Sequence, residues 1–132
     1  PVSISYENDP CDTAKALELY EKDIHGTYEK GEFEDIESII QGIIGKKGRV
    51  HVGFGDVISQ DFETPDALAE EIDRQIHNNY KLFPINLLAA KKGDDSITEK
   101  VQSDFEAKLS AIPLGAHQYL IDSYANPVKN IG

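Results

Sequence analysis

PVSISYE, at residues 1–7, has the pattern of a β-strand and decides much of the fold. Val2, Ile4 and Tyr6 alternate with two serines, which is the period of a strand that buries one face. We therefore expect these three apolar side chains to lie against a core. The strand also needs a partner, because isolated strands and hairpins are marginally stable in water.

The partner strand is predicted in the run RVHVGFGDV, from Arg49 to about Val57. Alternation again separates two faces of the strand. One face carries the apolar residues Val50, Val52 and Phe54. The other face carries His51, Gly53 and Gly55. Two glycines on one face leave room for another backbone or a ligand to approach closely.

The rest of the chain has the periodicity of six helical segments. They are expected between Thr13 and Gly31, between Gly31 and Gly45, from Pro65 to Tyr80, from Ile85 to Lys92, from Ser96 to before Pro113, and from about Ala116 to Tyr124. The second segment repeats Phe33 and five isoleucines at helical spacing, so we expect it to pack a broad apolar face. Asn126-Pro127 should end the last segment, because proline disrupts a helix interior.

The fold class predicted from these elements is α/β, a mostly helical segment with two or more strands of a mixed sheet. The 132 residues fit a single domain or the C-terminal part of one larger domain. Two widely separated strands make a poor sheet alone. Either the fold is mostly helical with a small sheet, or the two strands join others that lie outside this sequence.

Composition narrows the class of protein. The formal net charge of −11 repels nucleic-acid phosphates and anionic lipid headgroups, so overall electrostatics favour neither as a partner. A single cysteine, Cys11, excludes an internal disulfide framework and favours a reducing, cytoplasmic compartment. No apolar run approaches the roughly 20 residues that cross a bilayer. The absence of Met predicts an excised or processed fragment.

Several motifs, in their order along the chain, resemble one enzyme family. The first strand resembles the fourth conserved block of the glycerolipid (1-acylglycerol-3-phosphate) acyltransferases, a Val-Pro-Val-x-Ile-like strand. GRVHVGFG, at residues 48–55, is similar to a strand downstream of that block, and the runs at residues 9–12 and 124–128 resemble a bacterial subgroup of these enzymes. The resemblance implies the C-terminal part of an acyltransferase α/β fold.

The resemblance also implies a transferase of phospholipid biosynthesis. Such an enzyme moves an acyl chain from acyl-CoA or acyl carrier protein to a lysophosphatidic-acid-like glycerol hydroxyl, with no further cofactor. In the family a His-x4-Asp dyad and a Glu-Gly-Thr-Arg turn carry the chemistry, and both precede the fourth block. No catalytic residue is therefore expected here, and the isolated 132-residue segment is predicted to be inactive.

Four residues are the substrate-binding candidates. Pro1 and Val2 are implied, by the resemblance, to complete the wall of the acyl and glycerol-phosphate site. Tyr6 and Glu7 end the first strand, and ligands of α/β sheets gather at the carboxyl ends of strands. The acyl donor and the lysophospholipid-like acceptor would bind through the full-length enzyme at the inner face of the membrane, which the missing N-terminal part would contact.

Two His-x4-Asp matches occur in the sequence, and geometry argues against both. His51 and Asp56 lie on a predicted strand, where residues five apart point to opposite faces. His117 and Asp122 lie on a predicted helix, where five steps leave side chains about 140° apart. The four histidines lack the spacing of zinc ligands, so no metal site is predicted. Cys11, flanked by carboxylates, is expected to be a turn residue rather than a nucleophile.

A second class of function fits the same residues, namely a small acidic binding or regulatory module without catalytic activity. Lys46, Lys47 and Arg49 form a compact basic cluster before the second strand. Such a cluster is usually a solvated turn, although it can also meet a phosphate or an acidic carrier protein. Exposed edges on the two strands favour self-association of the segment under either interpretation.

Overall fold

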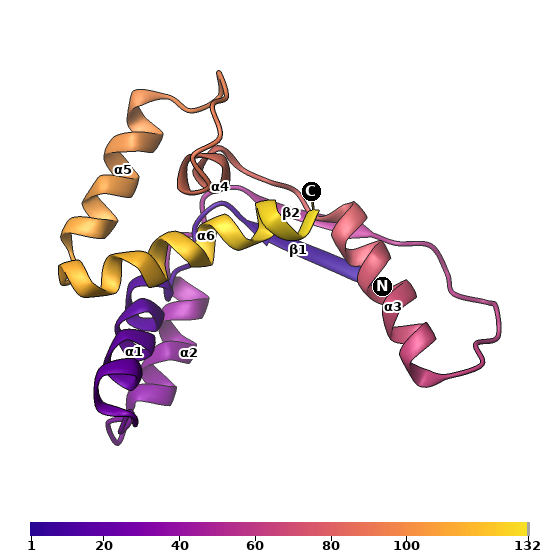
Figure 1. Cartoon of the computed structure of the whole chain (residues 1–132), viewed down its shortest axis with the longest axis horizontal. Coiled ribbons are helices and arrows are strands. Elements are labelled where there is room, and N and C mark those ends of the chain that lie inside the picture. The colour runs from indigo at the N-terminus through magenta and orange to yellow at the C-terminus, as the bar shows by residue number, and fades with distance from the viewer. Residues whose placement is uncertain (132) are drawn as a thin grey trace.

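The structure is a computed structural model that describes residues 1–131, and it is mostly helical with one small sheet (Figure 1). In chain order the elements are β1 (Val2–Tyr6), α1 (Asp12–His25), α2 (Glu34–Ile44), β2 (Val50–Phe54), α3 (Pro65–Asn79), α4 (Pro84–Ala89), α5 (Glu99–Ser110), the 3-10 turn η1 (Leu114–Ala116) and α6 (His117–Ile131). The predicted mostly helical α/β class is confirmed at this level. No helix of the described chain is both long and apolar enough to span a membrane.

β1 and β2 pair to form a two-stranded antiparallel sheet. Val2 lies opposite Phe54, and Tyr6 lies opposite Val50. Within residues 1–131 the sheet has only these two strands, and a larger mixed sheet with strands from outside this sequence stays a prediction. Both strands were predicted within a few residues, because period-two alternation is a local signal.

The backbone hydrogen bonds show which groups the sheet leaves at its edge. The Glu7 amide donates to the Arg49 carbonyl at 2.9 Å, and the Gly55 amide donates to the Pro1 carbonyl at 2.8 Å. Odd-numbered residues of β1 therefore bond across the pair. In an antiparallel ladder the alternate residues then direct their N–H and C=O groups outward, so β1 offers the backbone of Ile4 and its even-numbered neighbours at an edge.

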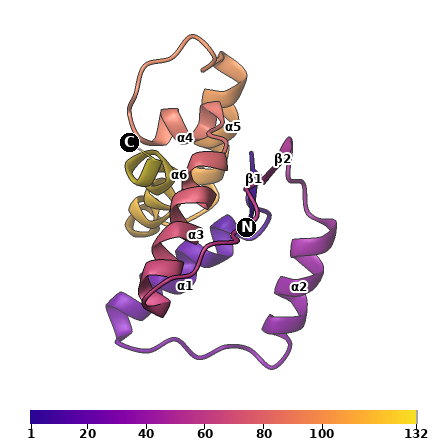
Figure 2. The same cartoon turned by 90° about the vertical axis from the view of Figure 1, so that its right-hand side faces the viewer.

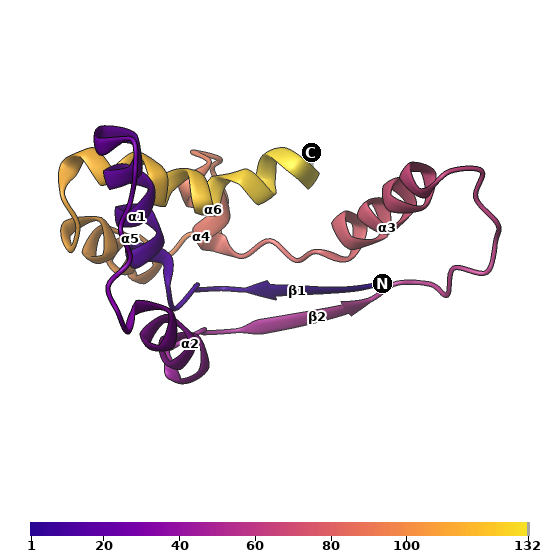
Figure 3. The ribbon, with the colours of Figure 1, turned by 90° about the horizontal axis from the view of Figure 1, so that it is seen from below.

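The helices are distributed unequally about these two strands. Figures 2 and 3 show α1, α3, α4, α5 and α6 on one side of the strands and α2 by itself on the other. α6 is the central helix of the larger group, since it packs against α1, α3 and α4. The sheet is therefore covered by helices from one side.

The hydrophobic core surrounds α6. Its buried apolar residues are Ala16, Phe83, Ile85, Ala89, Phe105, Ile112, Ala116, Leu120, Tyr124 and Ala125. Burying a large apolar side chain stabilises a fold by about 1.5–3 kcal/mol. The cluster takes residues from α1, α4, α5 and α6, so these four helices hold one another in place.

The sheet buries the face that was expected to be exposed. Ser3 and Ser5 are 3% and 0% exposed, whereas Val2 and Ile4 are each 50% exposed. The expectation that the apolar face lies against a core is therefore wrong. Small side chains explain the reversal, because they let the backbone after α3 lie close to the strand, where the Lys81 amide donates to Ser5 Oγ at 2.9 Å.

β2 shows the same reversal, and its glycines have the role that was predicted for them. Val50, Val52 and Phe54 are exposed, while Gly53 is buried. A Cβ atom on Gly53 would lie 2.7 Å from the Asn79 carbonyl oxygen, at the end of α3. The glycine thus permits a close approach of another backbone to the strand, as expected.

α2 also directs its apolar face outward. The helix buries none of its residues, and Ile43 and Ile44 are 71% and 73% exposed. Its opposite side lies against the start of α1, where Gln41 Nε2 donates to the Pro10 carbonyl at 3.3 Å. The prediction that this helix packs a broad apolar face is therefore wrong for the described residues, although the helix itself is confirmed.

α6 continues through Pro127 to Ile131, so the prediction that Asn126-Pro127 ends it is wrong. Proline in a helix interior removes one hydrogen bond and crowds the carbonyl four residues earlier, at a cost of about 3 kcal/mol. Tyr124, Ala125 and Val128 are buried on either side of the proline. Their burial offsets that cost and keeps the helix intact.

Candidate functional site

Pro1 and Val2, the expected wall of a substrate site, line an open hollow of about 500 Å³ at one end of the sheet. Further apolar lining comes from β2, from the loop after it and from α3, and consists of Phe54, Val57, Ile58 and Ile72. The Gly55 amide, which donates to the Pro1 carbonyl, fixes the end of the sheet beside this hollow. A concave apolar surface of this size can hold an apolar group of a ligand.

The hollow is open to solvent and nearly uncharged. Val57, which lines one side of the hollow, is 90% exposed, so few other residues cover its side chain. Asp56 is the only ionisable side chain among the residues that line the hollow. General acid–base catalysis requires a positioned proton donor or acceptor, and a nucleophile needs an adjacent base. The hollow is thus suited to binding and lacks a catalytic pair of side chains.

Tyr6 and Glu7, the other two candidates, lie at the opposite end of β1. Val2 and Tyr6 are four residues apart along the strand, which corresponds to about 13 Å. The structure therefore does not bring the four candidate residues together. Tyr6 is on the exposed apolar face of the sheet, and a role for it or for Glu7 in substrate binding stays a prediction.

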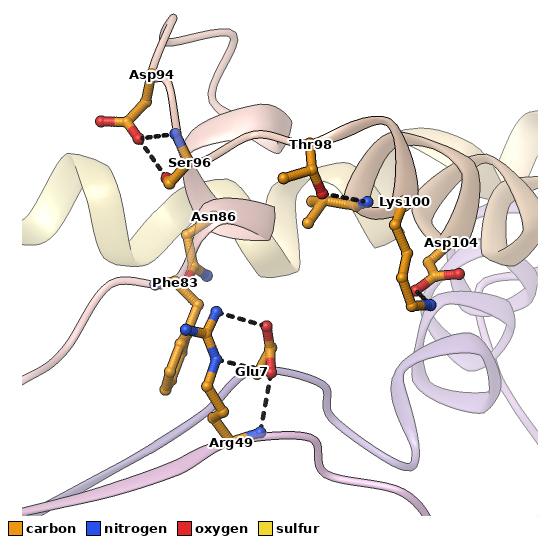
Figure 4. A network of polar contacts seen from close by, with 10 residues as sticks. Glu7, Arg49, Phe83, Asn86, Asp94, Ser96, Thr98, Lys100 and Asp104 are labelled. Atoms are coloured by element: carbon orange, nitrogen blue, oxygen red, sulfur yellow. Dashed lines mark hydrogen bonds and ion pairs between the residues drawn. The ribbon is translucent and has the colours of Figure 1, made fainter.

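Glu7 forms a two-pronged ion pair with Arg49 (Figure 4). Arg49 donates from Nε at 3.2 Å and from a terminal guanidinium nitrogen at 2.8 Å, and its backbone amide donates to the same carboxylate at 2.9 Å. These hydrogen bonds lower the pKa of Glu7 below its ordinary value, despite partial burial. Both carboxylate oxygens are occupied, so Glu7 joins the two strand ends.

Arg49 also connects the sheet to the helices. Its guanidinium lies 5.3 Å from the centre of the Phe83 ring, a cation–π contact that Figure 4 shows beside the ion pair. Phe83 is buried, and its amide donates to Asn86 Oδ1 at 2.8 Å at the start of α4. The basic cluster predicted before β2 thus contributes at least one residue to the packing of the fold.

Neither His-x4-Asp match forms a dyad. His51 lies on the helix-facing side of β2, and Asp56 follows the end of the strand at the hollow. His117 Nε2 lies 3.2 Å from the Ile112 carbonyl, whereas Asp122 accepts from Gln118 at 3.1 Å. His117 and Asp122 do lie on one helix, as predicted, whereas Asp56 lies beyond the end of β2 rather than on the strand with His51.

Cys11 and two acidic residues at the start of α2 form contacts with other residues of the chain. Cys11 precedes α1, as predicted, and its Sγ lies 3.5 Å from the Ser38 carbonyl of α2. Glu34 accepts from Tyr28 at 2.7 Å, and Asp35 pairs with Lys30 at 2.7 Å. Among residues 1–131 no group of three or more His, Cys, Asp or Glu side chains is placed to hold a metal ion.

A buried polar network was not predicted from the sequence. The carboxylate of Asp12 accepts hydrogen bonds from Lys108 Nζ and from the Tyr124 hydroxyl, both at 2.6 Å, and Asp12 is almost fully buried. The Asp9 amide donates to the same tyrosine oxygen at 3.1 Å. The network joins α1, α5 and α6. Asp12 is 96 residues from Lys108 and 112 from Tyr124 in the sequence, so no local pattern indicates the network.

A scan against models of protein families and searches of curated proteins and of solved structures found no match to this chain. A function must therefore be argued from the residues and their arrangement. Two features carry information here: the apolar hollow beside Pro1 and Val2, and the apolar faces that β1, β2 and α2 direct away from the helices.

Proposed function

We propose that this chain is the C-terminal portion of an acyltransferase of phospholipid synthesis. The full-length enzyme moves an acyl chain from acyl-CoA or acyl carrier protein to a lysophosphatidic-acid-like hydroxyl, at the cytoplasmic face of a membrane. This portion supplies scaffold and one wall of the pocket, and the catalytic dyad lies outside it. The basis is the resemblance of the two strands to those of glycerolipid acyltransferases.

The hollow beside Pro1 and Val2 is the observation that carries the proposal. The resemblance assigns these two residues to the acyl and glycerol-phosphate site, and they line an apolar hollow of about 500 Å³. An aliphatic chain gains about 0.8 kcal/mol for each buried CH₂ group, so even part of this surface contributes substantially to affinity. Ile72 of α3 lines the same hollow, so under this proposal α3 would form a second wall of the acyl site.

The uncovered apolar faces support the same proposal. Large contiguous apolar patches on a soluble protein mark surfaces that another part covers. One face of the sheet and one face of α2 are of this kind. In a full-length enzyme the upstream polypeptide would add strands at the edge of β1 and would cover the exposed face of the sheet.

The coding sequence upstream of the Pro1 codon provides the first test. We expect an open reading frame that encodes His-x4-Asp followed by Glu-Gly-Thr-Arg. The encoded full-length protein should transfer acyl groups to lysophosphatidic acid, and the 132-residue chain alone should not. Turnover by the 132-residue chain alone would contradict the assignment of scaffold and wall.

A pair of variants tests the hollow within the full-length enzyme. Ile72→Trp fills the hollow, so kcat/KM for a long-chain acyl donor should fall by about tenfold, while a short-chain donor is affected less. Leu114→Trp is the matched control, because Leu114 is 82% exposed and lies outside the hollow. Equal effects of the two substitutions would place the acyl chain elsewhere.

The alternative is a small acidic binding module, and the same exposed apolar faces favour it if no enzyme is attached. A start codon directly before the Pro1 codon, with no dyad encoded upstream, supports this alternative and overturns the acyltransferase proposal. An upstream half that lacks the dyad would instead indicate a family member that has lost activity.

A further inference from the structure

α2 carries an isoleucine stripe that the described residues leave uncovered. Its members share one side of the helix and are Phe33, Ile36, Ile39, Ile40, Ile43 and Ile44, exposed by between 49% and 73%. Six large apolar side chains on one helix face exceed the scattered single residues that are normal on a protein surface. The stripe is therefore a surface for a partner.

The opposite side of α2 already contacts the rest of the chain. Gln41 Nε2 donates to the Pro10 carbonyl, and Cys11 Sγ lies against the Ser38 carbonyl. Figure 2 shows α2 set apart from the group of helices around α6. The helix is thus held by its polar side, and this attachment directs the isoleucine stripe outward.

The two ends of the stripe carry opposite charges. Glu32 and Glu37 are exposed beside its N-terminal end, and neither forms an ion pair with another described residue. Lys46 is exposed just beyond the C-terminal end, and Lys47 follows it and donates to the Ile43 and Gly45 carbonyls at 3.0 and 3.2 Å. Charge therefore changes sign along the stripe, from acidic to basic.

We propose that α2 binds α2 of a second copy of this chain, in an antiparallel pair about a two-fold axis. With the axis between Ile39 and Ile40, Ile36 of one copy lies opposite Ile43 of the other. The acidic end of each helix then lies beside Lys46 and Lys47 of the second copy. A two-fold contact is self-complementary, so both charged ends are matched at once.

The charge pattern favours a second copy over a membrane. Helices that lie in a membrane surface carry lysine and arginine along their polar face, whereas that of α2 carries Glu34 and Asp35. A net charge of −11 also repels anionic lipids. A parallel helix pair is disfavoured as well, because it would place the acidic ends of both helices together.

The contact is small, so the association should be weak. A helix of 11 residues is about 16 Å long, and two such helices bury less than the roughly 1,600 Å² of a standard stable interface. We expect a dimer that dissociates on dilution, with a dissociation constant in the micromolar range or above, on the order of 10⁻⁶–10⁻⁴ M. The weight-average mass should rise with concentration from 14.6 kDa toward twice that value.

Sedimentation of the 132-residue chain over a wide concentration range tests the stripe. Ile40→Glu places a charge at the centre of the pair and should raise the dissociation constant by at least about tenfold. Leu114→Glu introduces the same charge at another exposed apolar residue and should leave it unchanged. Val52→Glu, on the exposed face of the sheet, should also leave it unchanged, and far-UV circular dichroism checks that each variant is folded.

A charge exchange tests the orientation. Glu32→Lys alone and Lys46→Glu alone should each weaken the dimer, because each places like charges together. The double variant exchanges the signs at both ends and should restore association to near the original level. Restoration would not occur if the two helices were parallel or if association used the sheet.

Three outcomes would overturn this proposal. A chain that stays monomeric at every concentration has no such contact, and a dimer that Val52→Glu disrupts but Ile40→Glu does not would use the sheet. A monomeric chain that sediments with phosphatidylcholine vesicles, and loses this property in Ile40→Glu, would assign the stripe to membranes. The proposal is independent of acyl transfer, since mass is measured on the chain itself and activity on the full-length enzyme.

Discussion

Asp12 is the residue that joins three helices through side-chain hydrogen bonds. Its carboxylate accepts from Lys108 and Tyr124 in a buried setting. Asp12→Ala would leave the partly buried Lys108 ammonium without its counter-charge and the tyrosine hydroxyl without its acceptor. We expect the free energy of unfolding to fall by about 3 kcal/mol, measured by urea denaturation.

Asp104→Ala is the matched control for that substitution. Asp104 also pairs with a lysine at 2.6 Å, but both side chains are more than half exposed. Exposed pairs of this kind contribute about 0.3–0.5 kcal/mol. Similar losses for the two variants would show that the Asp12 network does not support the fold.

Tyr124 should make the fold sensitive to alkaline pH. Burial, and then the hydrogen bond to Asp12, raise the pKa of Tyr124 well above its ordinary value. In the unfolded chain this tyrosine loses its proton near pH 10, whereas in the folded chain it keeps it. The stabilising contribution is therefore fully present below about pH 10 and is lost progressively as pH rises beyond it.

The urea midpoint of unfolding, measured at a series of pH values for the unchanged chain and for Tyr124→Phe, tests this effect. Other tyrosines also have raised pKa values, and the hydrogen bond to Glu34 raises the pKa of Tyr28 to about 12. The difference between the two proteins isolates Tyr124. That difference should shrink from about pH 9 to about pH 12, and a difference that stays constant with pH would contradict the prediction.

At the scale of elements, replacing two glycines by alanine should change the stability of the fold in opposite directions. A Cβ on Gly53 of β2 would lie 2.7 Å from the Asn79 carbonyl oxygen, so Gly53→Ala should destabilise the fold by about 1–3 kcal/mol. A Cβ on Gly42 of α2 meets no atom within 4 Å, and Gly42→Ala should stabilise by up to about 1 kcal/mol. Thermal unfolding of both variants would measure the signs, and a stabilising Gly53→Ala would exclude the close approach of α3.

The positions of the helices and strands could be predicted from the sequence, because periodicity and capping are local. Thr64 caps α3 by accepting from the Ala67 amide, next to the proline that begins the helix. α5 shows the limit of such signals: the segment was predicted to begin at Ser96, whereas Thr98 caps the helix and Glu99 begins it. The predicted end of α6 at Pro127 was wrong for another reason: burial of neighbouring side chains in the core outweighs the tendency of proline to end a helix.

Which face each element buries could not be predicted in the same way. An apolar face indicates that other residues cover it, but it does not show whether these residues belong to the same chain. We expected the helices of this chain to cover the apolar faces of β1, β2 and α2. β1 instead packs its serines against the backbone after α3, and α2 packs Gln41 and Ser38 against the start of α1. The hollow beside Pro1 also depends on Ile72 of α3, to which the resemblance assigned no role in the site.

At the scale of the whole molecule, a pair of substitutions should show which side of the sheet is the interior. Ile4→Ser changes an exposed side chain, so the free energy of unfolding should change by less than about 0.5 kcal/mol. Ser5→Ile forces a large side chain into a closed space and removes the acceptor of the Lys81 amide, at an expected cost of about 2–4 kcal/mol. Chemical denaturation compares the two, and a larger loss for Ile4→Ser would reverse the assignment of the faces.

The central position of α6 has a consequence for folding during synthesis on the ribosome. α1 is synthesised well before α6, yet it packs against α6, and the Asp9 amide donates to a hydroxyl that lies 115 residues later in the sequence. Contacts so distant in sequence slow folding, because their closure must precede any gain from them. During synthesis the side of α1 that packs against α6 therefore stays exposed until Tyr124 leaves the exit tunnel, and chaperones that bind exposed apolar surface have that interval in which to bind.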